Sequence, residues 1–201
     1  MKKIKICGLT RPEDIETVNL LKPEYCGFVI NFPKSKRNLI PEQVKLLRRE
    51  LNPSVIPVGV FVNQPPELVA ELLNQGVVSI AQLHGQETEE YLTTLRSLTV
   101  QPIWQAFQVK TGEELQLAAR STADFILLDA GQGEGRTFDW SCLESLDRPF
   151  GLAGGLKEDN LPLALRTRAE LLDVSGGVET EGYKDPEKIE RFISMVRREE
   201  R

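Results

Sequence analysis

The stretch KICGLT, from Lys5 to Thr10, decides the fold, because it joins a short apolar strand to a thiol, a glycine turn and the start of a helical pattern. The same succession of a β-rich apolar run and an amphipathic helical pattern recurs along the chain at a spacing of roughly 25 residues. The predicted strands are 4–7, 25–30, 56–62, 78–83, 103–107, 125–129, 150–153 and 171–174. The predicted helices are about 12–21, 41–51, 65–75, 88–97, 112–120, 140–146, 158–166 and 185–198.

Alternating strands and helices favour a parallel sheet whose crossover connections are helical. Eight such units predict an α/β fold, a single-domain (β/α)8 TIM barrel over residues 1–201. No Ser/Gly-rich linker or shift in composition divides the sequence. In this fold the carboxyl ends of the strands surround the active site, so residues at those ends are the first candidates for chemistry.

The composition excludes several classes of protein. With 40% hydrophobic and 27% charged residues, the chain has the balance of an ordinary globular protein. A net charge of −5 argues against general binding of nucleic acid or of a membrane surface. The opening MKKIKICGL lacks the long apolar core of a signal peptide, and no apolar run approaches the ~20 residues that span a bilayer.

The cysteines and the histidine limit the redox and metal chemistry. Cys7, Cys26 and Cys142 are odd in number and widely spaced, and His84 is the only histidine. No Cys/His spacing of metal-ligand type and no nucleotide-binding glycine motif occurs, so we expect neither a metal nor a cofactor. Free cysteines fit a reducing, cytoplasmic compartment, and Cys26 and Cys142 are expected to be packing residues.

Alternation along the first strand determines which side chains face the barrel interior. Ile4 and Ile6 share the face that helices cover, so Lys5 and Cys7 point inward. A lysine in the interior requires a carboxylate partner, and Asp173 on the last strand, beside the first, supplies one. We expect a Lys5–Asp173 contact that either favours the thiolate of Cys7 or only satisfies the interior electrostatically.

Two strand ends place acid/base groups at the same mouth. Cys7 ends the first strand and Asp129 ends another, and a thiol and a carboxyl in one pocket suit a proton-transfer isomerisation. Gln82 and His84 share parity on a third strand and point inward, and His84 has either a binding or orienting role or a purely structural one. The alternatives are a packing role for Cys7 and a capping role for Asp129.

Two glycine turns follow the last two strands. Gly154 and Gly155 lie in LAGGL, and Ser175, Gly176 and Gly177 lie in DVSGGVE. In barrels these two loops often bind phosphate through backbone N–H groups, and glycine lets the backbone approach the anion. The turns therefore predict a phosphorylated small-molecule ligand.

Several blocks occur in order along nearly the whole chain: KICGLT, SKRNL, GVFVNQ, QLHG, LLDAG with FDW, LAGGL, and DVSGGVE with GYKD. Their sequence and order resemble the phosphoribosylanthranilate isomerase family of tryptophan biosynthesis. That family consists of (β/α)8 barrels that need no metal or cofactor. The resemblance implies conversion of N-(5-phosphoribosyl)anthranilate into 1-(2-carboxyphenylamino)-1-deoxyribulose 5-phosphate by an Amadori rearrangement.

The resemblance also implies a role for individual residues. Cys7 would be the general base and Asp129 the general acid. Arg37, in SKR, would bind the anthranilate carboxylate. The turns at Gly154–Gly155 and Gly176–Gly177 would hold the phosphate.

The chain departs from the family pattern in three places. Lys36 replaces the proline of the usual SPR, and Gly176 follows Ser175 where two serines are usual. The segment 131–135, GQGEG, reads as a mobile lid, and Gln132 interrupts its usual pair of glycines. These differences bear on phosphate contacts and lid motion, not on the acid or the base.

Two alternatives remain in view. The related isomerase of histidine biosynthesis uses aspartates as acid and base, and the thiol of Cys7 and the acid-free strand IWQAFQ disfavour it. The second is a catalytically silent barrel that binds a phosphorylated small molecule or a partner protein, against which the joint presence of Cys7, Asp129 and Arg37 argues. The sequence leaves monomer and homodimer open.

Overall fold

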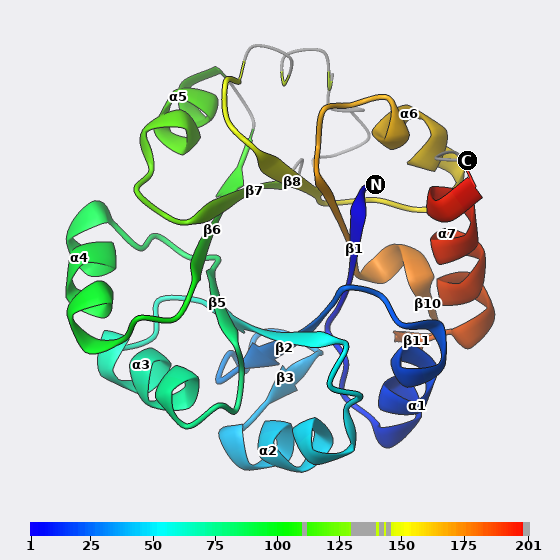
Figure 1. Cartoon of the computed structure of the whole chain (residues 1–201), viewed down its shortest axis with the longest axis horizontal. Coiled ribbons are helices and arrows are strands. Elements are labelled where there is room, and N and C mark those ends of the chain that lie inside the picture. The colour runs from blue at the N-terminus through cyan, green and yellow to red at the C-terminus, as the bar shows by residue number, and fades with distance from the viewer. Residues whose placement is uncertain (110–111, 130–139, 141–142, 144–145, 199–201) are drawn as a thin grey trace.

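Eight parallel strands close into a barrel, as the alternating pattern predicts. The computed structural model describes residues 1–109, 112–129, 140, 143 and 146–198. The barrel strands are β1 Lys3–Cys7, β2 Tyr25–Ile30, β4 Ile56–Phe61, β5 Ile80–Leu83, β6 Ile103–Gln108, β7 Phe125–Asp129, β8 Phe150–Ala153 and β9 Leu171–Val174. They run in the order β1-β9-β8-β7-β6-β5-β4-β2, and pairing of β1 with β2 completes the ring (Figure 1).

Helices surround the barrel on its outside (Figure 1). The helices are α1 Pro12–Leu21, α2 Pro41–Glu50, α3 Pro66–Asn74, α4 Glu89–Leu98, α5 Gly112–Arg120, α6 Leu161–Leu165 and α7 Pro186–Arg198, with a 3-10 turn, η2 Glu158–Asn160, before α6. Prolines begin α1, α2, α3 and α7, where the missing N–H has no helical partner to lose. The helix predicted at 140–146 lies largely outside the described residues. No helix in the described ranges is long and apolar enough to cross a bilayer.

Side chains alternate between the two faces of each strand, so the molecule has one apolar core outside the barrel and another inside it. Ile4 and Ile6 belong to the large core between the strands and the helices, which also includes Val18 of α1 and Phe192 of α7. A smaller core fills the barrel interior and is formed by Tyr25, Val58, Ile80, Trp104, Ala106, Leu127, Ala153 and Leu171. The parity argument for β1 therefore holds, and Lys5 and Cys7 face inward.

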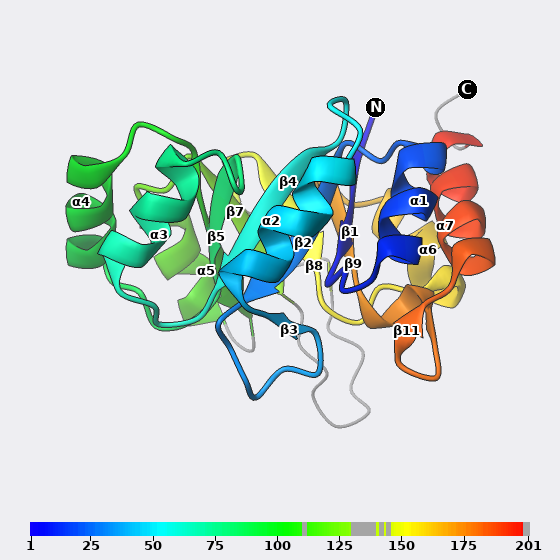
Figure 2. The same cartoon turned by 90° about the horizontal axis from the view of Figure 1, so that it is seen from below.

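Short strands that the sequence pattern does not reveal lie at one end of the barrel. The strand β3, Asn38–Leu39, pairs with the end of β2, and β10, Glu179–Thr180, forms a hairpin with β11, Tyr183–Lys184. In Figure 2, β3 and β11 lie at the lower edge of the molecule and the N-terminus lies at the upper edge. The lower edge is therefore the carboxyl end of the strands.

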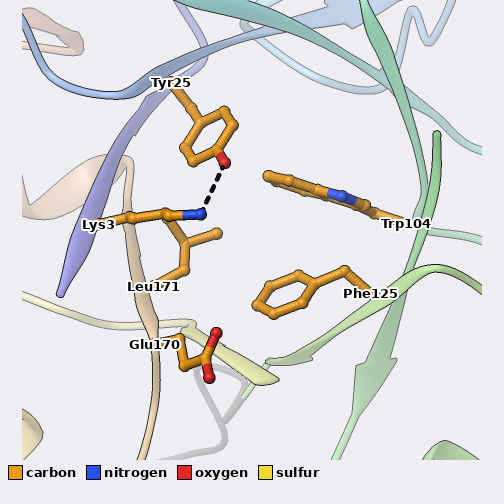
Figure 3. Close-up of a pocket in the computed structure, with 6 residues that line it drawn as sticks. All are labelled: Lys3, Tyr25, Trp104, Phe125, Glu170 and Leu171. Atoms are coloured by element: carbon orange, nitrogen blue, oxygen red, sulfur yellow. Dashed lines mark hydrogen bonds between the residues drawn. The ribbon is translucent and has the colours of Figure 1, made fainter. Parts of the chain in front are cut away.

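Aromatic rings line a small cavity at the opposite, amino end of the strands (Figure 3). The ring of Trp104 lies 5.0 Å from that of Tyr25 and 5.3 Å from that of Phe125, between centroids. The cavity has a volume of about 170 Å³, and Lys3 and Glu170 line it as well. The ammonium of Lys3 donates to the Tyr25 hydroxyl at 3.5 Å. This end of the barrel thus combines an aromatic wall with two charged side chains.

Candidate active site

The carboxyl ends of the strands surround a cavity of about 410 Å³. Most of the site residues that the sequence predicts line this cavity, although they lie far apart along the chain. The predicted residues that line it are Cys7, Arg37, Gln82, His84, Asp129, Gly154, Gly155, Asp173, Ser175, Gly176 and Gly177. Lys5 is not part of the lining and lies fully buried one layer deeper.

Cys7 ends β1 above a buried ion pair. Lys5 and Asp173 occupy paired positions on β1 and β9, and the Lys5 Nζ donates to the Asp173 Oδ2 at 2.8 Å. The predicted contact is therefore present. Gly27, on the neighbouring strand, leaves room for the thiol, because a Cβ there would lie 2.7 Å from the Cys7 Sγ. The residue is 9% exposed and lines the cavity.

Burial outweighs the neighbouring positive charge at Cys7. Burial raises the pKa of the Cys7 thiol above its ordinary value, and Asp173 raises it further. Lys5 acts in the opposite direction and lowers the same pKa, as does Lys184. Lys5 thus does more than satisfy the interior, but its charge does not bring the pKa of Cys7 below the ordinary thiol value.

Three polar side chains form a chain of contacts along one wall. His84 Nε2 lies 3.1 Å from the Asp129 Oδ2, and Gln82 Nε2 lies 3.3 Å from the His84 Nδ1. The buried Oε1 of Gln82 has no hydrogen-bond partner among the described residues. Because Asp129 ends β7 and His84 directly follows β5, the acid and the imidazole reach across the mouth from different strands.

Arg37 enters the cavity from the loop after β2, and its guanidinium is already paired. Its Nε and Nη2 donate to the two carboxylate oxygens of Glu179, at 2.6 and 2.8 Å. Its side-chain stem packs on Gly8, where φ is +83° and where a Cβ would clash with the Arg37 Cδ. The guanidinium of Arg37 is therefore held in an ion pair beside the cavity, whereas the side chain of Lys36 is 60% exposed.

The two glycine turns meet over the cavity. Gly154 and Gly155 adopt positive φ values of 84° and 67°, which other residues rarely adopt. Gly177 packs directly on the backbone of Leu156, and a Cβ there would clash with the Leu156 carbonyl oxygen. At Gly176, by contrast, the nearest atom to such a Cβ is the Arg37 Nη2, at 3.5 Å. Gly177 is thus required for the contact between the loops, whereas Gly176 faces open space beside Arg37.

Two charged residues of the site lie outside the sequence-based set. Glu179 and Lys184 face each other across the β10–β11 hairpin, and the Lys184 Nζ donates to the Glu179 Oε1 at 2.6 Å. Both residues occur in the sequence blocks DVSGGVE and GYKD. A two-residue strand is too short to show a periodic pattern, so the sequence could not predict that these side chains face the site. The sequence did contain one indication of a role in the site, because the charged residue Glu179 comes directly after a glycine turn.

Some expectations fall on residues that the structure does not describe. The lid at 131–135 and Cys142 lie outside the described residues. Cys26 lies in the outer core and is fully buried, and burial raises the pKa of its thiol to about 12, which fits a packing role. In the described part of the chain, no cluster of three or more His, Cys, Asp or Glu side chains could hold a metal ion.

A closed (β/α)8 barrel with a thiol, a carboxyl, a guanidinium and two glycine turns around one mouth is typical of enzymes that move protons on small anionic substrates. Comparison with known proteins identifies the family within this class of enzymes. Residues 4–195 match the family model described as N-(5'phosphoribosyl)anthranilate (PRA) isomerase. The chain therefore belongs to the N-(5'-phosphoribosyl)anthranilate isomerase family.

Individual relatives agree with the family assignment. An N-(5'-phosphoribosyl)anthranilate isomerase of Thermoanaerobacter sp. (strain X514) is 42% identical over 98% of each chain. The crystal structure of the isomerase from Thermotoga maritima has a TM-score of 0.88 at 34% identity, covering 98% of this chain and 99% of that one. A further isomerase structure, in complex with reduced 1-(o-carboxyphenylamino)-1-deoxyribulose 5-phosphate, has a TM-score of 0.86 at 33% identity, with coverage of 98% and 99%.

Proposed function

We propose that Cys7 is the general base and Asp129 the general acid with which this isomerase of tryptophan biosynthesis acts. The reaction converts N-(5'-phosphoribosyl)anthranilate into 1-(2-carboxyphenylamino)-1-deoxyribulose 5-phosphate. The observation that carries the proposal is that a thiol and a carboxyl face one cavity of about 410 Å³ together with Arg37 and both glycine turns. Such a cavity lies in the size range of small-molecule sites.

The rearrangement proceeds by proton transfers in sequence. An acid first protonates the furanose ring oxygen as its bond to C1 breaks, and the open imine forms. A base then removes the proton from C2, and the resulting enamine becomes the ketone as a proton is delivered to C1 and another leaves the C2 hydroxyl. Asp129 and Cys7 reach the mouth from β7 and β1, so the two groups approach a bound sugar from different sides.

Asp129 contacts a side chain that can orient its carboxyl. His84 Nε2 lies 3.1 Å from the Asp129 Oδ2, and the side-chain amide of Gln82 lies against the other ring nitrogen of His84. We therefore assign His84 and Gln82 the role of orienting the acid, beside any contact with the sugar hydroxyls.

We assign the two ends of the substrate, its anthranilate carboxylate and its phosphate, to different parts of the cavity. The pairing of Arg37 with Glu179 uses the Nε–Nη2 edge of the guanidinium and leaves its other edge for the anthranilate carboxylate. The phosphate belongs at the glycine turns, where Gly155 and Gly176 leave the backbone accessible. Ser175 is already engaged, since its hydroxyl donates to the Cys7 carbonyl at 2.9 Å, and we assign it to the support of β1.

A turnover assay with substrate generated in situ tests the function. The wild-type chain should form the ribulose product and bind the reduced product analogue. A silent barrel would bind the analogue and leave the substrate unchanged. We also infer that the chain acts in the cytoplasm, because its free thiols need a reducing compartment. We further infer that it is a single domain, because one barrel accounts for the described residues.

A further inference from the structure

The β10–β11 hairpin contributes a buried ion pair that the reaction above does not use. Glu179 and Lys184 are 5% and 2% exposed at their side chains, and their charges lie directly against the cavity residues. Burying two charges is costly unless their mutual contact and additional hydrogen bonds compensate. A buried pair at this place therefore calls for an explanation beyond stability.

Glu179 contacts three positive groups. Its carboxylate accepts from both Nε and Nη2 of Arg37 and from the Nζ of Lys184, while the exposed Lys36 approaches it at 3.3 Å. Arg37 and Lys184 lower the pKa of Glu179 to about 2, against the opposing effect of burial. Glu179 therefore stays ionised at neutral pH and holds the guanidinium plane of Arg37 by one edge, which fixes the direction of the other.

Lys184 extends the same network to Cys7. Besides Glu179, its Nζ donates to the carbonyl oxygen of Ser175 at 3.1 Å, and the Ser175 hydroxyl in turn donates to the Cys7 carbonyl. The positive charge of Lys184 also lowers the pKa of the Cys7 thiol. One buried lysine thus reaches the strand end that carries the base through Ser175, and it also acts on the base electrostatically.

We propose that Glu179 and Lys184 are a pair of positioning residues that couple the carboxylate-binding Arg37 to the base Cys7. The proposal rests on the roles given above to Arg37 and Cys7. Glu179 aims Arg37, and Lys184 supplies the second positive charge that favours the thiolate when the base must act. Neither residue touches the reacting atoms.

A purely structural role for the pair is less consistent with the remaining contacts of the hairpin. Lys188 donates to the Glu179 carbonyl at 2.8 Å, Thr180 donates to Asp185 at 2.6 Å, and Arg11 donates to the Lys184 carbonyl at 3.0 Å. These contacts hold the hairpin without either buried side chain. They also supply a matched control, because Lys188 supports the same hairpin.

The first experiment measures the thiol of Cys7 directly and does not need turnover. The rate of iodoacetamide alkylation is followed from pH 7 to 10.5 in wild type, Lys184→Met and Lys188→Met, with peptide mass spectrometry assigning the label to Cys7. Lys5, Asp173, Lys184 and Arg37 are the charged groups that act on this thiol, and the buried thiol of Cys26 also acts electrostatically with it. Loss of a nearby positive charge disfavours the thiolate, so Lys184→Met should raise the midpoint by at least about half a pH unit.

The control decides between an electrostatic and a structural role. Lys188→Met should keep the wild-type midpoint within about a tenth of a pH unit, because the contact of Lys188 is to a backbone oxygen. Equal midpoints in wild type and Lys184→Met overturn the role of Lys184, and so does an equal shift in both variants. Because alkylation does not depend on which group is the base, this result stands apart from the proposed function, which fails if Cys7→Ala keeps its activity.

The second experiment addresses Arg37. Binding of reduced 1-(o-carboxyphenylamino)-1-deoxyribulose 5-phosphate and of its phenyl counterpart without the carboxylate is measured in wild type, Glu179→Gln and Glu158→Gln. Glu179→Gln should weaken binding of the carboxylate-bearing analogue about tenfold and leave the phenyl counterpart little changed. Glu158, which also pairs with an arginine but is half-exposed outside the cavity lining, should give wild-type affinities. An equal loss for both analogues, or none for either, overturns the positioning of Arg37.

Discussion

The two ends of the barrel are built from the same strands but differ in what fills them. At the carboxyl end, a cavity of about 410 Å³ is lined by a thiol, a carboxyl, an imidazole and a guanidinium. At the amino end, a cavity of about 170 Å³ is lined mainly by Tyr25, Trp104 and Phe125. The difference shows how the fold separates the groups that act on a ligand from the groups that pack the interior.

The placement of charge sharpens this contrast. At the amino end, Lys3 and Glu170 stay exposed to solvent beside the aromatic rings. At the carboxyl end, Lys5, Asp173 and Lys184 are buried. Burying charges costs desolvation free energy even when the charges are paired, and the pairing only offsets that cost, which the exposed charges of the amino end do not incur. Substitutions at the two ends should therefore change different properties.

The largest effect is expected at Cys7. Cys7→Ala should lower kcat about 10²–10⁴-fold, because it removes a proton-transfer group, with an unchanged thermal midpoint of unfolding. Cys7→Ser should be nearly as inactive, since the pKa of a hydroxyl is far above neutral. Steady-state kinetics alongside thermal unfolding make the measurement. Retention of more than about a tenth of the wild-type activity would remove Cys7 as the base.

Asp129→Asn should lower kcat by a similar factor, about 10²–10⁴-fold, through loss of the proton donor. Its affinity for the reduced product analogue should stay near that of wild type, because an acid acts chiefly in the transition state. Kinetics and calorimetric titration separate the two quantities. A collapse of analogue affinity with kcat intact would make Asp129 a binding residue.

Trp104 tests the opposite end. Trp104→Ala should lower the free energy of unfolding by about 3–5 kcal/mol, because it empties a ring site that is only 6% exposed. Urea unfolding measures the loss, and Trp104→Phe should show a smaller one. Below the unfolding transition, kcat should remain close to wild type. A large drop in kcat of the folded variant would contradict the view that the amino end of the barrel contributes to stability and not to activity.

Acid should destabilise the carboxyl end through Glu179. The pKa of Glu179 falls from an ordinary 4.5 to about 2 in the folded protein, chiefly because Arg37 and Lys184 donate to its carboxylate. The group therefore stabilises the fold fully above pH 4.5, and this contribution, up to about 3 kcal/mol, is lost as the pH falls toward 2. Urea unfolding at several pH values should show a shallower loss across this window in Glu179→Gln. Parallel pH profiles for the two proteins would contradict the assignment.

The smallest effect concerns recognition at the mouth. Arg37→Ala should raise KM about 10–150-fold, because a charge-assisted hydrogen bond is worth about 1.5–3 kcal/mol. The ligand for comparison is the product analogue without its carboxylate, which wild type should bind poorly and the variant no worse. If the variant loses the same affinity for both ligands, Arg37 acts on the phosphate or on the fold.

The sequence predicted the barrel because its signal is local and repeated. Each strand and helix carries its own periodicity, and parity on β1 was enough to place Lys5 against Asp173, whose side chains meet at 2.8 Å. The contact of Arg37 with Glu179 joins residues 142 positions apart, one in a loop and one in a two-residue strand, where no periodicity applies. Pattern alone could not show that the guanidinium is already held by a carboxylate. It also could not show that burial raises the pKa of Cys7 despite Lys5.

The raised pKa of the Cys7 thiol has a consequence for survival of the enzyme between turnovers. Oxidants and electrophiles attack the thiolate, and the sulfinic and sulfonic acids that follow are generally irreversible. Because Cys7 is buried and its thiol is predominantly protonated at neutral pH, it offers little of that reactive form to peroxide. Burial of Cys7 therefore limits oxidation and alkylation of this thiol in the empty protein.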